Sequence, residues 1–142
     1  MKIMISACLL GVPCRYDGAS KPQPWVEALA RRHELVPVCP EQLGGLPTPR
    51  EPSERQGDRV VMRGGADVTE QYRRGAEAAL RLYRVLGCEA AVLKERSPSC
   101  GYGRVYDGTF TGTLTDGDGV TAELLVRNGI LVYGESQAAE LL

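Results

Sequence analysis

The sequence predicts an α/β protein with a mostly parallel sheet. Short apolar runs of strand length alternate along the chain with runs of helical periodicity, and parallel strands need such crossovers between them. The chain has 142 residues, of which 43% are hydrophobic and 25% are charged, and this length and balance favour one globular domain over residues 1–142. We therefore expect a single-domain, three-layer, Rossmann-like fold with a long Pro/Gly-rich loop.

Two strands and one helix are predicted in the first part of the chain. Residues 2–6 form a mostly apolar run that ends just before Cys8, and turn residues follow. A helix is predicted over residues 24–32, because proline is tolerated at a first helical position. Residues 35–38 indicate a second strand, and Cys39 follows it at once. Each of these strands therefore leads into a loop that carries a cysteine.

The middle of the chain combines a long loop with the clearest helix. Residues 40–66 are rich in Gly and Pro, with a possible short strand at residues 60–62, and so long a loop inside one domain is usually functional. Asp67 and Glu70 have the spacing of a capping box, and apolar side chains then recur at helical spacing as far as Gly87. We expect a helix between these limits.

In the last third of the chain, predicted strands and helices alternate in the same way. Residues 89–94 are predicted as a third strand, and Cys100 lies in the loop that follows. Residues 102–113 indicate an irregular segment or a hairpin. Residues 120–127 indicate a helix that is stopped by an Asn-Gly pair, and residues 130–133 indicate a last strand before a short terminal helix.

Charge and hydropathy favour a small-molecule partner. The formal net charge is -1 and the sequence pI is about 5.9, so the chain lacks the basic field that holds a nucleic-acid backbone. The apolar run at the N-terminus is too short for a signal peptide, and no later segment approaches the roughly 20 apolar residues of a membrane helix. We expect a cytoplasmic protein with neither a nucleic-acid nor a membrane partner.

The five cysteines indicate where the chemistry lies. Cys8, Cys39 and Cys100 each follow a predicted strand, and the carboxyl ends of parallel strands meet at one edge of a sheet, where ligands bind. These three thiols can therefore converge. Cys88 lies between a helix end and an apolar strand, which predicts a core position. Cys14 could line the site, but a structural role is the preferred interpretation.

Three thiols at equivalent positions favour a metal group over simple packing, although most free cysteines are small buried hydrophobes. A structural zinc site is disfavoured, because no pair has CxxC spacing and the sole histidine, His33, neighbours no cysteine. An iron-sulfur cluster held by three thiolates leaves one iron without a protein ligand, as a catalytic metal site requires. Cysteine spacing by itself does not choose between iron-sulfur and other soft metals.

Four sequence blocks carry a resemblance to a known family. They are SACLLG at residues 6–11, CRYDG at 14–18, CPEQLGGLPTPR at 39–50 and KERSPSCG at 94–101. The sequence resembles the DUF523 family, which includes the thiouracil desulfidases, and the likeness covers nearly the whole chain in order. It implies an enzyme that removes sulfur from a thiocarbonyl compound, such as 2-thiouracil or a related thiolated nucleobase, to give the oxo product and sulfide without net redox change.

The resemblance also implies residue roles. A 4Fe-4S cluster with one open iron would be held by Cys8, Cys39 and Cys100, and Glu41 and Ser97 match positions that have catalytic roles in the desulfidases. From the residues alone, Glu41 fits a solvated loop carboxylate and Ser97 fits either a turn cap or a hydrogen-bond donor to substrate.

Two rival functions stay open at this point. One is a noncatalytic iron-sulfur or metal-binding module that acts in sulfur transfer or redox sensing, and the other is a metal-free α/β protein that binds a small molecule. Several charged loop residues are expected to form salt bridges within the loops: Arg15, Asp17, Arg50, Lys94 and Arg96. Tyr102 and Tyr106 could stack on a flat heterocycle, but packing is the preferred interpretation.

Overall fold

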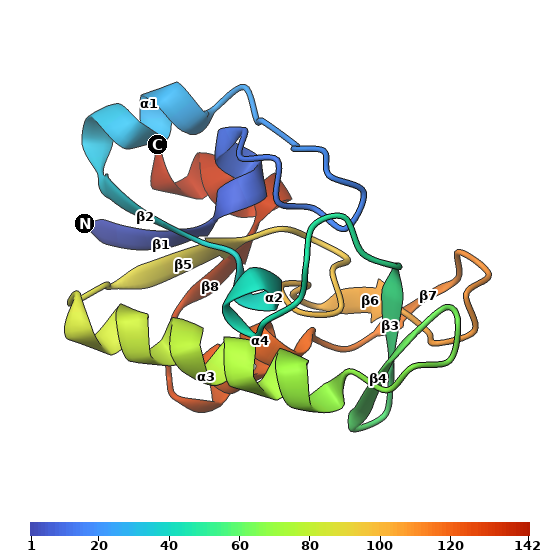
Figure 1. The fold of residues 1–142 in the computed structure, drawn as a ribbon. Coiled ribbons are helices and arrows are strands. Elements are labelled where there is room, and N and C mark those ends of the chain that lie inside the picture. The colour runs from blue at the N-terminus through green and yellow to red at the C-terminus, as the bar shows by residue number, and fades with distance from the viewer.

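The computed structural model describes all 142 residues and contains a four-stranded parallel sheet (Figure 1). Its strands are β1 (Lys2–Ser6), β2 (Glu34–Val38), β5 (Ala90–Leu93) and β8 (Val132–Gly134). They lie in the order β2-β1-β5-β8, and every neighbouring pair is parallel. The predicted mostly parallel α/β sheet is therefore confirmed, with four strands at or near the predicted positions.

The strands that follow β1 in the sequence are added first on one side of β1 and then on the other. Ile3 pairs with Leu35 of β2 on one side and with Ala90 of β5 on the other. After β2 has formed one edge, the chain crosses over to build β5 and β8 on the opposite side. In open parallel sheets, a ligand crevice forms at the carboxyl ends of the strands where this change of side occurs. Here that point lies between β1 and β5.

Helices cover both faces of the sheet (Figure 1). On one face lie α1 (Val26–Arg32) and the 3-10 helix η2 (Glu135–Leu141), and on the other lie α3 (Thr69–Val85) and α4 (Val120–Arg127). Alternate residues of β1 divide between the two resulting cores: Ile3 and Ile5 pack on the α1 side, and Met4 packs on the α3 side. The three-layer architecture is confirmed. No helix is both long and apolar enough to span a membrane.

The Pro/Gly-rich segment holds more regular structure than the sequence predicted. This segment contains α2 (Pro40–Leu43), β3 (Ser53–Gln56) and β4 (Arg59–Met62). Three further short elements lie outside it: the 3-10 turn η1 (Ala7–Leu10) and the strands β6 (Arg104–Tyr106) and β7 (Leu114–Asp116). The antiparallel hairpin β3–β4 forms because Val60 is buried in a small core with Leu46, Val68 and Tyr72. The segment 102–113, expected to be irregular or a hairpin, holds the first strand and the turn of the antiparallel hairpin β6–β7, and the second strand follows directly after it.

The start of α3 differs from the expected capping box. The Asp67 carboxylate accepts a hydrogen bond from the backbone N–H of Thr69 at 2.9 Å, and α3 begins at Thr69. The hydrogen bonds of Thr69, together with Arg59, lower the pKa of Asp67 to about 2. The Asp67 bond goes to Thr69 and not to Glu70, Glu70 makes no return bond, and Val68 is the N-cap residue of α3, so the expected capping box does not form.

Two glycines bring α2 directly against α3. A Cβ atom at Gly44 would overlap the backbone carbonyl of Gln71, and a Cβ atom at Gly75 would overlap the carbonyl of Pro40. Only glycine permits this backbone-to-backbone approach. The contact sets the position of α2, and hence of Glu41, relative to α3.

Candidate functional site

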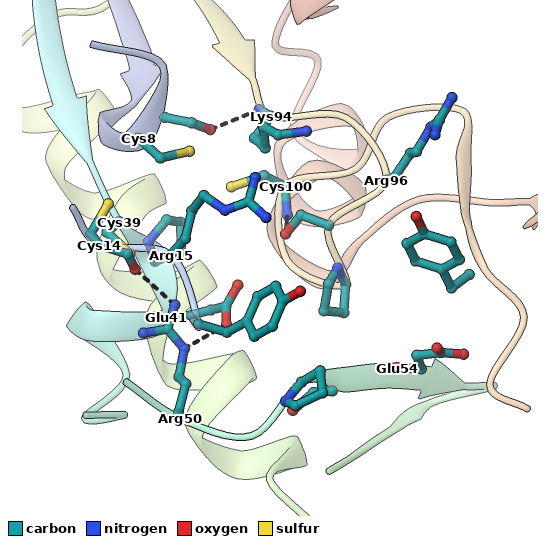
Figure 2. A pocket seen from close by; sticks show the side chains of 18 of the residues that line it. Cys8, Cys14, Arg15, Cys39, Glu41, Arg50, Glu54, Lys94, Arg96 and Cys100 are labelled. Carbon is teal, nitrogen blue, oxygen red and sulfur yellow. Dashed lines mark hydrogen bonds and ion pairs between the residues drawn. The ribbon is translucent and has the colours of Figure 1, made fainter. Parts of the chain in front are cut away.

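A cavity of about 520 Å³ opens at the carboxyl ends of the sheet strands. Cys8 enters it from η1 just after β1, Cys39 enters it directly after β2, and Cys100 enters it from the loop after β5. The parallel topology brings these three thiols together although they are as far apart in the sequence as residue 8 and residue 100. Figure 2 shows the sulfur atoms of Cys8 and Cys100 pointing into the same space.

The three thiols influence one another. Burial raises the pKa of Cys8 to about 11, Lys94 opposes that rise, and Cys39 adds to it. Burial also raises the pKa of Cys100 strongly, a hydrogen bond with Ser6 lowers it, and the nearby Cys8 and Cys39 thiols raise it further. A raised pKa favours the protonated thiol at Cys8 and Cys100, and metal binding to a thiol requires its deprotonation.

A fourth thiol, that of Cys14, also lines the cavity. Cys14 is 2% exposed and lies in hydrogen-bonding contact with the Cys39 thiol, which also donates to the Cys14 carbonyl at 3.7 Å. Burial, followed by Cys39 and Cys8, raises the pKa of Cys14 to about 12. Cys14 therefore belongs to the cavity wall. Cys88 lies in the apolar core, where the sequence placed it.

Glu41 is shielded, which corrects the interpretation of a solvated loop carboxylate. It lies in the first turn of α2, and its side chain is 15% exposed. Its Oε1 atom accepts hydrogen bonds from Arg50 Nε at 3.0 Å and from the Tyr72 hydroxyl at 2.8 Å. Its Oε2 atom has no protein partner. Because Glu41 lines the cavity and is near enough to Cys100 to raise its pKa, this free oxygen is available to a ligand beside the thiols.

Arg50 joins three parts of the site. Its guanidinium is 3% exposed and donates to Glu41, to the Pro47 carbonyl at 3.1 Å, to Thr48 Oγ1 at 3.0 Å and to the Cys14 carbonyl at 3.0 Å. Figure 2 shows the Arg50 guanidinium reaching both the Glu41 carboxylate and the Cys14 carbonyl. The salt bridge expected of Arg50 exists, and its partner is the candidate catalytic carboxylate.

Other predicted charged residues also form ion pairs. Arg15 pairs with Asp17 at 3.4 Å, and Lys94 pairs with Glu135 at 2.8 Å. Arg96 lines the cavity without a carboxylate partner.

The hydroxyl oxygen of Ser97 accepts hydrogen bonds from the backbone of its own loop. Its Oγ accepts the backbone N–H groups of Ser99 at 3.1 Å and of Cys100 at 3.0 Å. The side chain thus caps the turn that presents Cys100. It also lines the cavity, and its hydroxyl hydrogen remains available to a ligand, because both of these bonds use the oxygen as acceptor.

Ser6 is a site residue that the sequence did not single out. It is 2% exposed, its Oγ accepts the backbone N–H of Lys94 at 2.9 Å, and it makes the hydrogen bond to Cys100. It therefore links the ends of β1 and β5 at the point where the thiols meet. Its position as the last residue of a strand that precedes a site cysteine was the available signal.

The outer wall of the cavity comes from the two hairpins. Glu54 of β3 is 8% exposed, and its Oε1 accepts the backbone N–H groups of Gly108 at 2.9 Å and Phe110 at 3.1 Å. Arg63 lies over the Phe110 ring at 5.8 Å from its centroid. Tyr106 lines the cavity, whereas Tyr102 does not. No local sequence signal indicated Glu54, because its partners are distant in the chain.

The cavity offers soft thiol ligands from several cysteines. No three His, Cys, Asp or Glu side chains are close enough together to hold one metal ion. His33 is engaged elsewhere, with the N-terminal amine and the Leu141 carbonyl. Soft thiols spread around a cavity are the ligands that iron-sulfur clusters take.

Comparison with known proteins decides the family. The model of the 2-thiouracil desulfurase family matches residues 3–137. This chain belongs to that family. Among solved structures, a [4Fe-4S]-dependent thiouracil desulfidase, TudS, which is a DUF523 protein, superposes with a TM-score of 0.93 at 53% identity, over 99% of this chain and 94% of that one. Among curated proteins, the uncharacterized YbbK of Bacillus subtilis is 40% identical over 150 residues, 99% of each chain.

Membership of the 2-thiouracil desulfurase family confirms the resemblance drawn from the four sequence blocks. The likeness to the desulfidase structure spans both the sheet and the loops that form the cavity, since 99% of this chain superposes. The thiols, Glu41 and Ser97 all lie within the residues that the family model matches.

Proposed function

We propose that this protein is a 4Fe-4S-dependent desulfidase that converts a small thiocarbonyl compound, such as 2-thiouracil, to its oxo product and sulfide. The observation that carries the proposal is the convergence of the Cys8, Cys39 and Cys100 thiols on one cavity beside Glu41. Family membership and the likeness to a [4Fe-4S]-dependent thiouracil desulfidase support it.

Cys8, Cys39 and Cys100 would hold the cluster. When bound through three thiolates, such a cluster supplies an iron with an open position, a soft Lewis acid that favours sulfur over oxygen and polarises the C=S carbon. Lys94 and Arg15 lie near enough to Cys8 to lower its pKa. They therefore offset part of the negative charge that deprotonated thiols bring into the site.

Glu41 would move the proton. Its Oε2 atom, which no protein donor occupies, takes a proton from the water that attacks the thiocarbonyl carbon and then returns it to the departing sulfur. The balance is C=S plus water giving C=O plus hydrogen sulfide, so no oxidant or reductant is needed. The hydroxyl hydrogen of Ser97 is placed to donate to a heteroatom of the substrate, because its oxygen is held by two backbone N–H groups.

The test is sulfide release by anaerobically reconstituted protein. We expect about four irons and four acid-labile sulfides per chain and the formation of uracil and sulfide from 2-thiouracil. Glu41→Gln should keep the iron and lose turnover by about 100-fold or more, the usual contribution of a general base. Glu27→Gln, at an exposed position of α1, is the matched control and should retain full turnover.

One outcome would reject the proposed function, and another would reject the role of Glu41 in it. Full iron and sulfide content without sulfide release from thiocarbonyl compounds would favour the noncatalytic role in sulfur transfer or redox sensing. Unchanged turnover in Glu41→Gln would remove Glu41 from the chemistry.

A further inference from the structure

We infer that Tyr72 is a positioning residue for this reaction: together with Arg50 it holds one oxygen of the Glu41 carboxylate, so that Oε2 alone meets the substrate and water. The inference rests on the proposed function and assigns a role to a residue of α3, an element that carries no predicted ligand or catalytic group.

The first support is the placement of the Tyr72 hydroxyl. Tyr72 is 1% exposed and packs in the small core with Leu46, Val60 and Val68. A buried tyrosine needs a partner for its hydroxyl, whereas phenylalanine would fill the same apolar space without one. The hydroxyl donates to Glu41 Oε1 at 2.8 Å, across 31 residues of sequence.

The second support is that both donors reach the same oxygen. Tyr72 and the buried Arg50 guanidinium bond to Oε1, and neither bonds to Oε2. A rotation or displacement of the carboxylate away from this arrangement would break both bonds inside a largely buried site, where unsatisfied polar groups are costly. One oxygen of Glu41 therefore stays held by the two donors, and the other stays turned to the cavity.

The third support is the rigid contact between the two elements. Tyr72 lies on α3 three residues before Gly75, and Glu41 lies on α2 three residues before Gly44, and these two glycines make the backbone contact between the helices. Neither helix can shift along the other without a backbone clash. The position of Tyr72 is thus transmitted to Glu41 by packing as well as by the hydrogen bond.

The chemical consequence concerns turnover more than binding. Proton transfer depends steeply on the position of the base, and displacements below 1 Å are enough to slow it. The Tyr72 hydroxyl is already committed to Glu41, so its removal should lower kcat and leave KM unchanged.

The experiment compares Tyr72→Phe with Tyr83→Phe in reconstituted enzyme. Tyr83 lies on the same helix, is also buried, and makes no hydrogen bond to the site, so its variant is the matched control. We expect kcat to fall about tenfold in Tyr72→Phe, with KM, iron content and visible absorption as in the wild type, and no change in Tyr83→Phe. In a Glu41→Gln background, the Tyr72→Phe substitution should have no further effect on kcat.

A second readout does not depend on turnover. In protein without a cluster, the infrared carboxylate stretch of Glu41 should shift when Tyr72→Phe removes a donor, and this difference should vanish in the Glu41→Gln background. Absence of the shift would overturn the inference, and so would a Tyr72→Phe effect of equal size in both backgrounds. Wild-type turnover in Tyr72→Phe would overturn the inference alone, whereas a fully loaded wild type that releases no sulfide would reject the proposed function as well.

Discussion

Ser97 shows how a single hydroxyl can present a thiol to the cavity. Its oxygen accepts two consecutive free N–H groups of the turn, those of Ser99 and Cys100. Loss of that oxygen leaves both N–H groups without a protein acceptor in a half-buried loop, and unsatisfied donors of this kind destabilise a fold. The turn and the proposed chemistry therefore depend on the same hydroxyl group, the turn on its oxygen and the chemistry on its hydrogen.

We predict that Ser97→Ala lowers the free energy of unfolding of the cluster-free protein by about 1–2 kcal/mol, the usual cost of losing a side-chain cap. Ser97→Thr keeps a hydroxyl and should stay close to the wild type. Urea unfolding followed by circular dichroism measures the difference. Ser20→Ala, which removes a hydroxyl without a hydrogen bond in the structure, is the control. Equal midpoints for Ser97→Ala and the wild type would show that the turn does not need the cap.

At the scale of elements, the contact between α2 and α3 sets the geometry of the site. Alanine normally stabilises a helix interior relative to glycine by about 1 kcal/mol. At Gly75 that gain is outweighed, because the added Cβ atom would meet the carbonyl of Pro40 in the first turn of α2. A change in α3 is therefore expected to displace the element that carries Glu41.

We predict that Gly75→Ala destabilises the protein by about 1–3 kcal/mol, the range for overpacking a tight contact. Turnover should fall as well, because α2 must move away and Glu41 moves with it. Arg74→Ala, on the exposed side of the same helix, is the control. Urea unfolding and sulfide release measure the two effects. A stabilised Gly75→Ala variant would contradict the close approach of the two backbones.

At the scale of the whole molecule, the three thiols lie next to the ends of β1, β2 and β5. These segments are far apart in sequence, and a group bound to all three exists only in the folded chain. Binding that is confined to the folded state stabilises it by mass action. The cluster is therefore expected to act as a cross-link across the sheet edge.

We predict that cluster loading raises Tm by at least about 5 °C, which corresponds to about 2 kcal/mol for a chain of this size. Cys8→Ser should lose both the cluster and the rise in Tm. Cys88→Ala, at a core position outside the cavity, should retain iron. Anaerobic thermal unfolding with and without reconstitution, together with iron analysis, measures both effects. An equal Tm for loaded and cluster-free protein would mean that no group bound to the three thiols stabilises the folded chain.

The positions of the strands and of three cysteines could be predicted from sequence, because both follow from local patterns. Short apolar runs between helical segments predict a parallel sheet, and the carboxyl ends of its strands share one edge. Cys8, Cys39 and Cys100 follow such runs, and all three line one cavity. Their role as cluster ligands stays a prediction, as do the roles of Glu41 and Ser97.

Sequence by itself determined the fold class, the family and the edge of the sheet where the chemistry gathers, since periodicity and contiguous motifs are properties of neighbouring residues. Only the tertiary structure decided that Tyr72 and Arg50 hold one oxygen of Glu41, that Cys14 joins the cavity wall, and that Glu54 anchors a distant hairpin. These contacts join segments tens of residues apart. They depend on how closely two backbones approach and on which rotamer each side chain adopts, and no local pattern in the chain encodes either.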